Sequence, residues 1–443
     1  MAQNVKQANK LFFIAALALA FLFRLAFGLC LGLGTSQADE KQIYLIGLKC
    51  YTTGAWPYFG PDVTSSIQIP GALQGLLVGL PFYVLPIPEA PYLLLNILSF
   101  SSLFFFAWYC SRRLPEIPQW FIWSWLLTAP WLLFVSTNIY NPSYVLPAAI
   151  LFFVAAIETY PFLSRDIIPA RWANLMMGLS LFWIMQLHLS WVVLVPYLLV
   201  SFYFQLKRFG RRFLSLALWF ALGAVITGSV LLPTFIKFGF QRGIGGTNET
   251  VGFSTGNVLR NLNIVEGVLG RFLSFASFEI PRFIGNNTAA RLAFMKDNPW
   301  LAPFVVFLTL VGILQSIALL LLWFKKEHGQ KDWQAVKYFT LATVLLLYAS
   351  FLFSMKSPVS HTFYVMIPVA MLYSLYCWSE FLKQKKWQKF ALLVVICGLI
   401  FDIGVAAYNF RRTSIFVERS KIVDALKAKD YHLLGDRREG ARY

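Results

Sequence analysis

The chain alternates between long apolar runs and short breaks that hold Pro, Lys, Arg or turn-forming residues. The runs are about 16 to 24 residues long, the length at which a helix crosses a hydrocarbon core of ~30 Å. Ten-residue segments of alternating apolar and polar positions are absent from the sequence, so a membrane β-barrel does not fit. The pattern predicts an all-α polytopic membrane protein with about eleven transmembrane helices, within limits of 10 to 13. The predicted spans are 11–33, 91–111, 119–136, 142–160, 173–188, 189–205, 213–236, 301–324, 336–354, 361–382 and 389–408.

For two apolar stretches, the number of membrane crossings does not follow directly from the length of the run. Stretch 172–205 has 34 residues, and as one helix it would be ~51 Å long. We therefore expect a tight hairpin that turns near 186–190. If run 71–87 also spanned the membrane, every later basic loop would fall outside. We expect this run to be a juxtamembrane helix or a re-entrant element, which keeps the basic loops inside.

Charge predicts the orientation of the spans, because Lys and Arg collect in cytoplasmic loops. Lys6 and Lys10 place the N-terminus inside, whereas the outer turns 136–141 and 186–190 carry no Lys or Arg. The expected inner positions include Arg112-Arg113, Arg165, Arg171, Lys207-Arg208, Arg211-Arg212, Lys325-Lys326, Lys331, Lys383, Lys385-Lys386 and Lys389. A cleaved signal peptide is the alternative for the first run, since Ser36-Gln37-Ala38 resembles a cleavage site. The length of the run and Arg24 within it favour a membrane span.

Composition excludes several classes of protein. The chain has 443 residues, 58% of them hydrophobic and only 13% charged, whereas a soluble domain carries about 25% charged residues. The net charge of +18 comes from basic residues that are scattered between the spans, so a nucleic-acid-binding domain is not indicated. The five cysteines lie mostly in apolar runs, which does not suggest a disulfide scaffold.

Two segments on the predicted outer side are large, 34–90 and 237–300. The expected organisation is a transmembrane domain over 1–408, with juxtamembrane helices in the first outer segment, and a basic tail over 409–443 that lies outside. No repeat of fixed period is visible, so a transporter built from duplicated halves is not supported.

An adjacent carboxylate pair, Asp39-Glu40, follows the first span on its outer side. Asp39 with Gln42 three residues later fits a capping box that opens the next helix. The same pair could supply a general base at the membrane face. The two interpretations are compatible, because a cap position also fixes the orientation of a carboxylate.

The Arg-containing first run, the short linker and Asp39-Glu40 resemble the GT-C fold glycosyltransferases, which use sugars linked to polyprenyl or dolichyl phosphate. The nearest resemblance is to the branch that holds protein O-mannosyltransferases and the lipid A aminoarabinose transferase. The residues that carry it are Arg24, Gly34, Asp39-Glu40, Tyr44, Gly54, Trp56-Pro57, Gly60-Pro61 and Pro70-Gly71-Ala72-Leu73. A looser similarity extends to Asn141-Pro142, Gln186, His188, Pro196, Lys356, His361, Tyr364 and Pro368.

The resemblance implies transfer with inversion at the sugar carbon, with Asp39 as general base and Glu40 orienting it or sharing the acceptor contact. We expect Arg24, Lys356 and His361 to bind the donor phosphate. The expected substrate pocket contains Tyr44, Trp56, Tyr58, Asn138, Asn141, His188 and Tyr364.

Each of these residues also has a structural interpretation. Lys356 could be a flank residue that extends to the interface, and His361 and His188 could be polar groups at helix ends. Arg24 lies ~15 Å below the outer end of its helix, where a buried Arg pairs with the protein interior or faces a wet cavity.

Relatives often carry a second acidic residue where this chain has Asn138 and Asn141, so no metal ligand is predicted and a divalent metal is left open as a cofactor. Relatives of the aminoarabinose type carry Lys-Pro-Pro-Leu where this chain has 69–73, so that sugar specificity is not implied.

The expected partners are a polyprenyl-phosphate sugar donor, a hydroxyl-bearing lipid, glycan or protein acceptor and membrane lipids. The expected location is a bacterial inner membrane with the site facing the periplasm or exterior. A flippase of lipid-linked glycans and a non-catalytic assembly subunit are the alternative functions.

Overall fold

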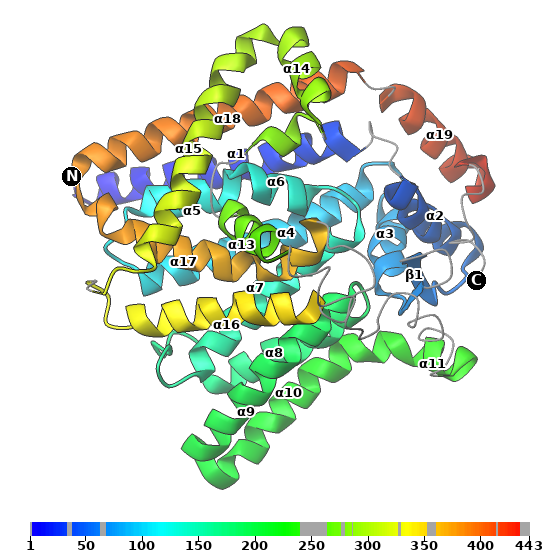
Figure 1. Cartoon of the computed structure of the whole chain (residues 1–443). Coiled ribbons are helices and arrows are strands. Elements are labelled where there is room, and N and C mark those ends of the chain that lie inside the picture. The colour runs from blue at the N-terminus through cyan, green and yellow to red at the C-terminus, as the bar shows by residue number, and fades with distance from the viewer. Residues whose placement is uncertain are drawn as a thin grey trace.

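The computed structural model of the chain describes residues 2–32, 38–62, 68–239, 264–275, 280–285, 287–326, 329–351, 360–412 and 415–434. The fold is a helical bundle in which several long helices run in similar directions (Figure 1). The helices that occupy the predicted spans are α1 (Ala2–Gly32), α4 (Ala90–Arg113), α5 (Gln119–Thr128), α6 (Pro130–Thr137), α7 (Val145–Thr159), α8 (Ala170–Met185), α9 (Val195–Phe209), α10 (Phe213–Gly228), α15 (Ala302–Leu322), α16 (Trp333–Phe351), α17 (Ile367–Ser379) and α18 (Lys385–Arg412). The prediction of an all-α polytopic membrane protein is therefore confirmed.

The count of eleven spans is not confirmed. By length and composition, six described helical segments can cross a membrane, or up to seven when the bent pair α5–α6 counts as one span. Segment Leu189–Phe238 counts once in that total although it holds two predicted spans. Phe202 of α9 contacts Phe220 of α10 with 5.1 Å between ring centroids, so the chain reverses between them. Two other predicted spans are shorter apolar helices, α7 with 15 residues and α17 with 13.

The first outer segment forms a small unit at one end of the bundle (Figure 1). It consists of α2 (Ala38–Thr53), the antiparallel pair β1 (Phe59–Asp62) and β2 (Gln68–Pro70), and α3 (Leu73–Val84). The 12 residues of α3 give a helix of ~18 Å, and this helix packs against α2.

Shorter elements complete the bundle. They are η1 (Asn141–Tyr144), η2 (Leu189–Leu194), η3 (Gly210–Arg212), η4 (Ser229–Leu231), α11 (Leu232–Phe238), α13 (Ile264–Phe275), η6 (Pro281–Phe283), α14 (Thr288–Asp297), η7 (Pro299–Leu301), η8 (Ser360–Met366), η9 (Phe381–Lys383), α19 (Ile415–Ala428) and η10 (Tyr431–Leu434). The predicted hairpin in 172–205 is present as the break between α8 and η2. The C-terminal helix α19 lies at the same end as α2, where Arg419 pairs with Glu89 at 2.5 Å.

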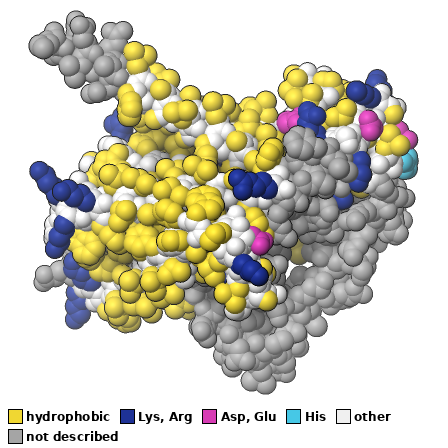
Figure 2. All heavy atoms as spheres, turned by 90° about the horizontal axis from the view of Figure 1, so that it is seen from above, with side chains coloured by type: hydrophobic (Ala, Val, Ile, Leu, Met, Phe, Trp, Pro, Cys, Tyr) yellow, Lys and Arg dark blue, Asp and Glu magenta, His cyan; other side chains and the backbone are white. Residues whose placement is uncertain are grey.

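The surface divides into an apolar middle and charged ends. Hydrophobic side chains cover the middle of the face in Figure 2, and Lys and Arg gather at its left edge. We call that edge the basic end and the opposite edge the α2 end. At the basic end the chain passes from α4 to α5, from α7 to α8, from α15 to α16 and from α17 to α18. This division agrees with helices that cross a bilayer between two polar interfaces.

Helices α8 and α10 pack with their backbones in contact. A Cβ added at Gly178 would lie 2.0 Å from the carbonyl oxygen of Phe220, and one at Gly223 would lie 2.1 Å from that of Leu175. Glycine is therefore required at both positions, as in other membrane helix pairs that approach closely through small residues.

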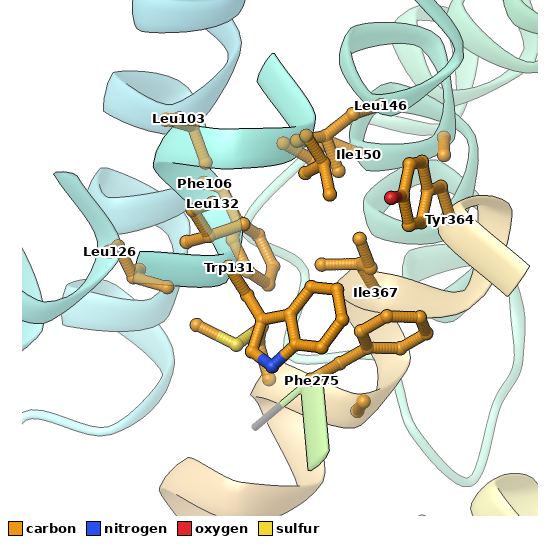
Figure 3. Close-up of a cluster of buried hydrophobic side chains, with 14 of the residues drawn as sticks. Leu103, Phe106, Leu126, Trp131, Leu132, Leu146, Ile150, Phe275, Tyr364 and Ile367 are labelled. Atoms are coloured by element: carbon orange, nitrogen blue, oxygen red, sulfur yellow. The ribbon is translucent and has the colours of Figure 1, made fainter. Parts of the chain in front are cut away.

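A buried apolar cluster joins helices that are distant in the sequence (Figure 3). The Trp131 ring of α6 meets Phe275 of α13 edge to face, with 5.0 Å between centroids. Phe275 in turn lies 5.8 Å from the Tyr364 ring of η8. The cluster fixes α13 and η8 against the centre of the bundle.

A buried ionic network ties together the basic end. The Arg113 guanidinium, which has no exposed surface, donates to Asp332 at 2.6 Å, to the Tyr376 hydroxyl at 2.8 Å and to the Leu163 carbonyl at 2.7 Å. Its Nη1 also lies 3.4 Å from Glu158. These contacts connect α4 with α7, α17 and the loop before α16. The sequence interpretation treated Arg113 only as an orientation signal and did not predict this network.

Arg165 completes the network around Asp332. It donates to the Asp332 carboxylate at 2.7 Å and to Gln330 at 2.9 Å. Burial of Asp332 alone would raise the pKa of its carboxyl, but the Arg165 hydrogen bonds and the Arg113 charge lower that pKa below its ordinary value. The carboxylate is therefore ionised at neutral pH.

Replacing Asp332 with Asn should destabilise the protein, because it leaves the buried Arg113 without a full counter-charge. Losing one partner of a buried pair costs ~3–5 kcal/mol, so we expect a clearly lower melting temperature in detergent. The pKa of Asp332 is lowered by folding, so its contribution is present above the unfolded pKa of ~3.9 and is lost as the pH falls through the folded value. The difference between wild type and D332N should therefore be constant near neutral pH and should disappear in acid.

Asp297→Asn is the matched control, since Asp297 is exposed on α14. Equal melting temperatures for D332N and D297N at pH 7 would show that the network does not stabilise the bundle.

Candidate functional site

The candidate site lies at the α2 end, where the first outer segment packs against the bundle. The hydroxyl of Tyr44 on α2 donates to the Pro88 carbonyl at 2.5 Å, and its ring contacts Phe82 of α3. Burial, together with nearby Glu89, raises the pKa of Tyr44 well above its ordinary value. Tyr44 therefore stays neutral and fixes α2 on α3. It was expected in the substrate pocket, but its hydroxyl is occupied by this structural hydrogen bond.

The loop around Tyr58 joins the first outer segment to α11. Its carbonyl accepts hydrogen bonds from the Thr234 hydroxyl at 2.8 Å and from the Gly71 amide at 2.9 Å. The ammonium of Lys237 lies 4.4 Å from the centre of the Tyr58 ring. This places a cation against an aromatic ring at the edge of the segment.

Gly71 brings the same segment onto the break between α8 and η2. Its φ of +134° is a conformation that side chains avoid, and a Cβ there would lie 2.7 Å from the Gln186 side chain. Two parts of the sequence that the resemblance singled out, 70–73 and Gln186, are thus in contact.

Several buried polar atoms at this end have no hydrogen-bond partner among the described residues. Gln74, three residues after Gly71, has no exposed surface, and neither atom of its amide is paired. The other unpaired atoms are Gln186 Oε1, Trp56 Nε1, Asn138 Oδ1 and the Tyr144 hydroxyl. Buried polar groups in folded proteins are normally paired, so each of these atoms is a point where water or a polar ligand can complete the hydrogen bonding.

The catalytic pair expected from the sequence lies in the first turn of α2. The helix begins at Ala38, so Asp39 is inside the helix and the capping-box interpretation, which made Asp39 the residue before it, is wrong by at least one position. The side chains of Asp39 and Glu40 lie outside the described residues.

Arg24 was expected either at the donor phosphate or paired within the protein interior, and its observed hydrogen bonds are to protein groups. Its side chain has no exposed surface, and it donates to the Leu127 carbonyl at 2.9 Å and to the Ser136 and Ser99 hydroxyls at 2.5 and 3.4 Å. Leu127 lies at the end of α5, just before the 45° bend to α6. These hydrogen bonds join the guanidinium to α4 and to both parts of the bent pair α5–α6, while its Nε has no hydrogen-bond partner among the described residues.

Arg271 is a cation that the sequence interpretation missed. It lies on α13, which packs against α15, α16, α17 and η8. It interacts electrostatically with Tyr364, whose hydroxyl also hydrogen-bonds Tyr140. The only signal in the sequence was a basic residue in a largely apolar stretch of the second outer segment.

The remaining predicted residues are placed as follows. His188 accepts a hydrogen bond from the Ser190 amide at 3.1 Å and so caps η2. Tyr364 is buried beside Tyr140. Lys356 and the side chains of Asn141 and His361 lie outside the described residues. Among the residues that are described, no three His, Cys, Asp or Glu side chains come together as metal ligands.

Comparison with known proteins identifies the fold. No family model matches the chain, and no curated protein sequence matches it. Among solved structures it is similar to ArnT from Cupriavidus metallidurans bound to undecaprenyl phosphate, with a TM-score of 0.51 and 13% identity, over 98% of this chain and 78% of that one. The apo structure of the same protein gives a TM-score of 0.50 and 12% identity over the same shares. The resemblance to GT-C fold membrane glycosyltransferases is confirmed at the level of the fold.

Proposed function

We propose that the chain is a membrane glycosyltransferase that moves a sugar from a polyprenyl-phosphate donor to a hydroxyl-bearing acceptor. The likeness in fold to ArnT, which binds undecaprenyl phosphate, over 98% of the chain is the observation that carries this proposal. The unpaired polar interior at the α2 end supports it, because a sugar offers many hydrogen-bonding groups. A bacterial inner membrane with the α2 end facing outward fits the charge of the opposite end.

The reaction needs a base and a cation. An acceptor oxygen attacks the anomeric carbon, the bond from that carbon to the phosphate oxygen breaks, and polyprenyl phosphate leaves with the electron pair. Asp39 takes the acceptor proton, and Glu40 orients Asp39 or contacts the acceptor. Direct displacement inverts the anomeric configuration.

The leaving phosphate gains negative charge and needs a preorganised positive partner. Arg271 is our candidate in place of Arg24, because α13 carries it into the bundle beside Tyr364. Lys356 and His361 remain candidates for the same phosphate. The sugar, whether a hexose or a pentose, is selected by the groups around Gln74, Trp56 and Asn138.

Asp39→Asn should lower turnover by about 10²–10⁴-fold, the usual contribution of a general base. The assay supplies a panel of polyprenyl-phosphate sugars with native lipid and protein extract as acceptor source, and it quantifies released polyprenyl phosphate. Glu40→Gln should have a smaller effect. Asp297→Asn, on the exposed face of α14, should turn over like wild type.

Turnover of D39N equal to wild type would move the base elsewhere. Absence of release by the wild type from every donor would contradict the transferase and favour a flippase or an assembly subunit.

Arg271→Gln and Arg24→Gln should separate catalysis from structure. Removing a group that stabilises developing charge lowers kcat by ~10²–10³-fold. We expect R271Q to lower kcat by this factor and to change the melting temperature little. R24Q should instead lower the melting temperature, because it unpairs the Leu127 carbonyl in the bundle interior. The reverse pattern would return the phosphate role to Arg24.

A further inference from the structure

A groove opens on the side of the bundle at the basic end, far from the candidate site. Its volume is about 410 Å³, within the ~300–1,000 Å³ of small-molecule sites. It lies between α5, α15, α18 and the end of α17 with η9. Its aromatic lining residues are Phe121, Trp125, Trp378, Phe381, Trp387 and Phe390.

The groove has a closed floor and a rim that faces the bilayer. Trp125 and Val394 are each 2% exposed and form part of the floor, whereas Leu314 is 64% exposed. The lining residues of α15 and α18 recur at helical spacing, so each helix turns one apolar stripe toward the groove. An alkyl chain in the bilayer can therefore enter from the side.

The groove lies at the level of one leaflet of the bilayer. Its residues on α15 are 4 to 11 positions before the end of the helix at Leu322, or ~6–16 Å from it. A leaflet is half of a ~30 Å core, so the groove opens into the leaflet at the basic end. A polyprenyl donor whose phosphate lies at the α2 end would present its headgroup to the other leaflet.

Four exposed lysines stand at the polar end of the groove. Lys325 and Lys326 follow α15, and Lys385 and Lys386 begin α18. None of the four has an ion pair with any residue within the described ranges. Lys386 lies over the ring of Trp387, which lines the groove.

The described carboxylates at this end are already engaged. Glu380 pairs with Lys383 at 2.8 Å, and Asp332 is held by Arg113 and Arg165. Glu116 accepts a hydrogen bond from Gln330. No carboxylate in the described part of the chain therefore pairs with these four lysines, which lie beside an apolar groove at the membrane surface.

We propose that this groove binds an anionic glycerophospholipid, with one acyl chain between α5, α15, α17 and α18 and the headgroup phosphate against Lys325, Lys326, Lys385 and Lys386. The aromatic lining packs against the chain, and the lysines select the charge of the headgroup. The proposal does not depend on the proposed transferase activity.

Native mass spectrometry of the full chain from nanodiscs tests this proposal. The discs contain phosphatidylcholine with equal phosphatidylglycerol, and the retained lipid is identified and counted. We expect the wild type to retain phosphatidylglycerol preferentially. Changing Lys325, Lys326, Lys385 and Lys386 to Gln should reduce that retention by about fivefold per lysine at low salt. Ala318→Trp should reduce retention of either lipid by filling the groove.

Matched controls separate this site from general surface charge. Replacing Lys207, Arg208, Arg211 and Arg212 with Gln removes four basic residues from the same end but away from the groove, and Ala221→Trp adds bulk on α10. Both should retain lipid like wild type. Equal retention of the two lipids by the wild type, equal loss in the controls, or displacement of phosphatidylglycerol by added polyprenyl phosphate would each overturn the proposal.

Discussion

The helix bends by 45° between α5 and α6 at Pro130, and Arg24 donates a buried hydrogen bond to the Leu127 carbonyl beside the bend at 2.9 Å. A bilayer core offers no water to a freed backbone group, so a helix can break there only where the protein itself supplies a partner. The guanidinium supplies it and reaches Ser136 on the far side of the bend. The bend in turn positions α6 and its Trp131 against Phe275, so the arrangement of α13 depends on it.

The same requirement explains why the two ends of the bundle differ. At the basic end Arg113 donates to five acceptors and is the centre of a hydrogen-bonded ionic network. At the α2 end the polar groups around Gln74 and Gln186 are buried but incompletely paired. The unpaired polar groups of the α2 end can therefore still form hydrogen bonds with water or with a polar ligand.

The positions of the helices could be predicted from local patterns in the sequence. Hydropathy placed a helix in every predicted span, because the length of an apolar run depends on neighbouring residues only. The environments of Arg24 and Tyr44 could not be predicted, because their partners lie 103 and 44 positions away. The contacts of Arg113 with Glu158 and Asp332 could not be predicted for the same reason. Arg271 was missed because an Arg in an outer segment ordinarily faces water, and only the fold shows that α13 enters the bundle.

The most direct measurement is the anomeric configuration of the transferred sugar, determined by NMR on the product made by purified wild-type protein from a polyprenyl-phosphate sugar of known configuration. The account predicts an inverted product and one polyprenyl phosphate released per sugar transferred, because the acceptor displaces the phosphate directly. Retention of configuration, or movement of the intact donor without release of polyprenyl phosphate, would contradict it.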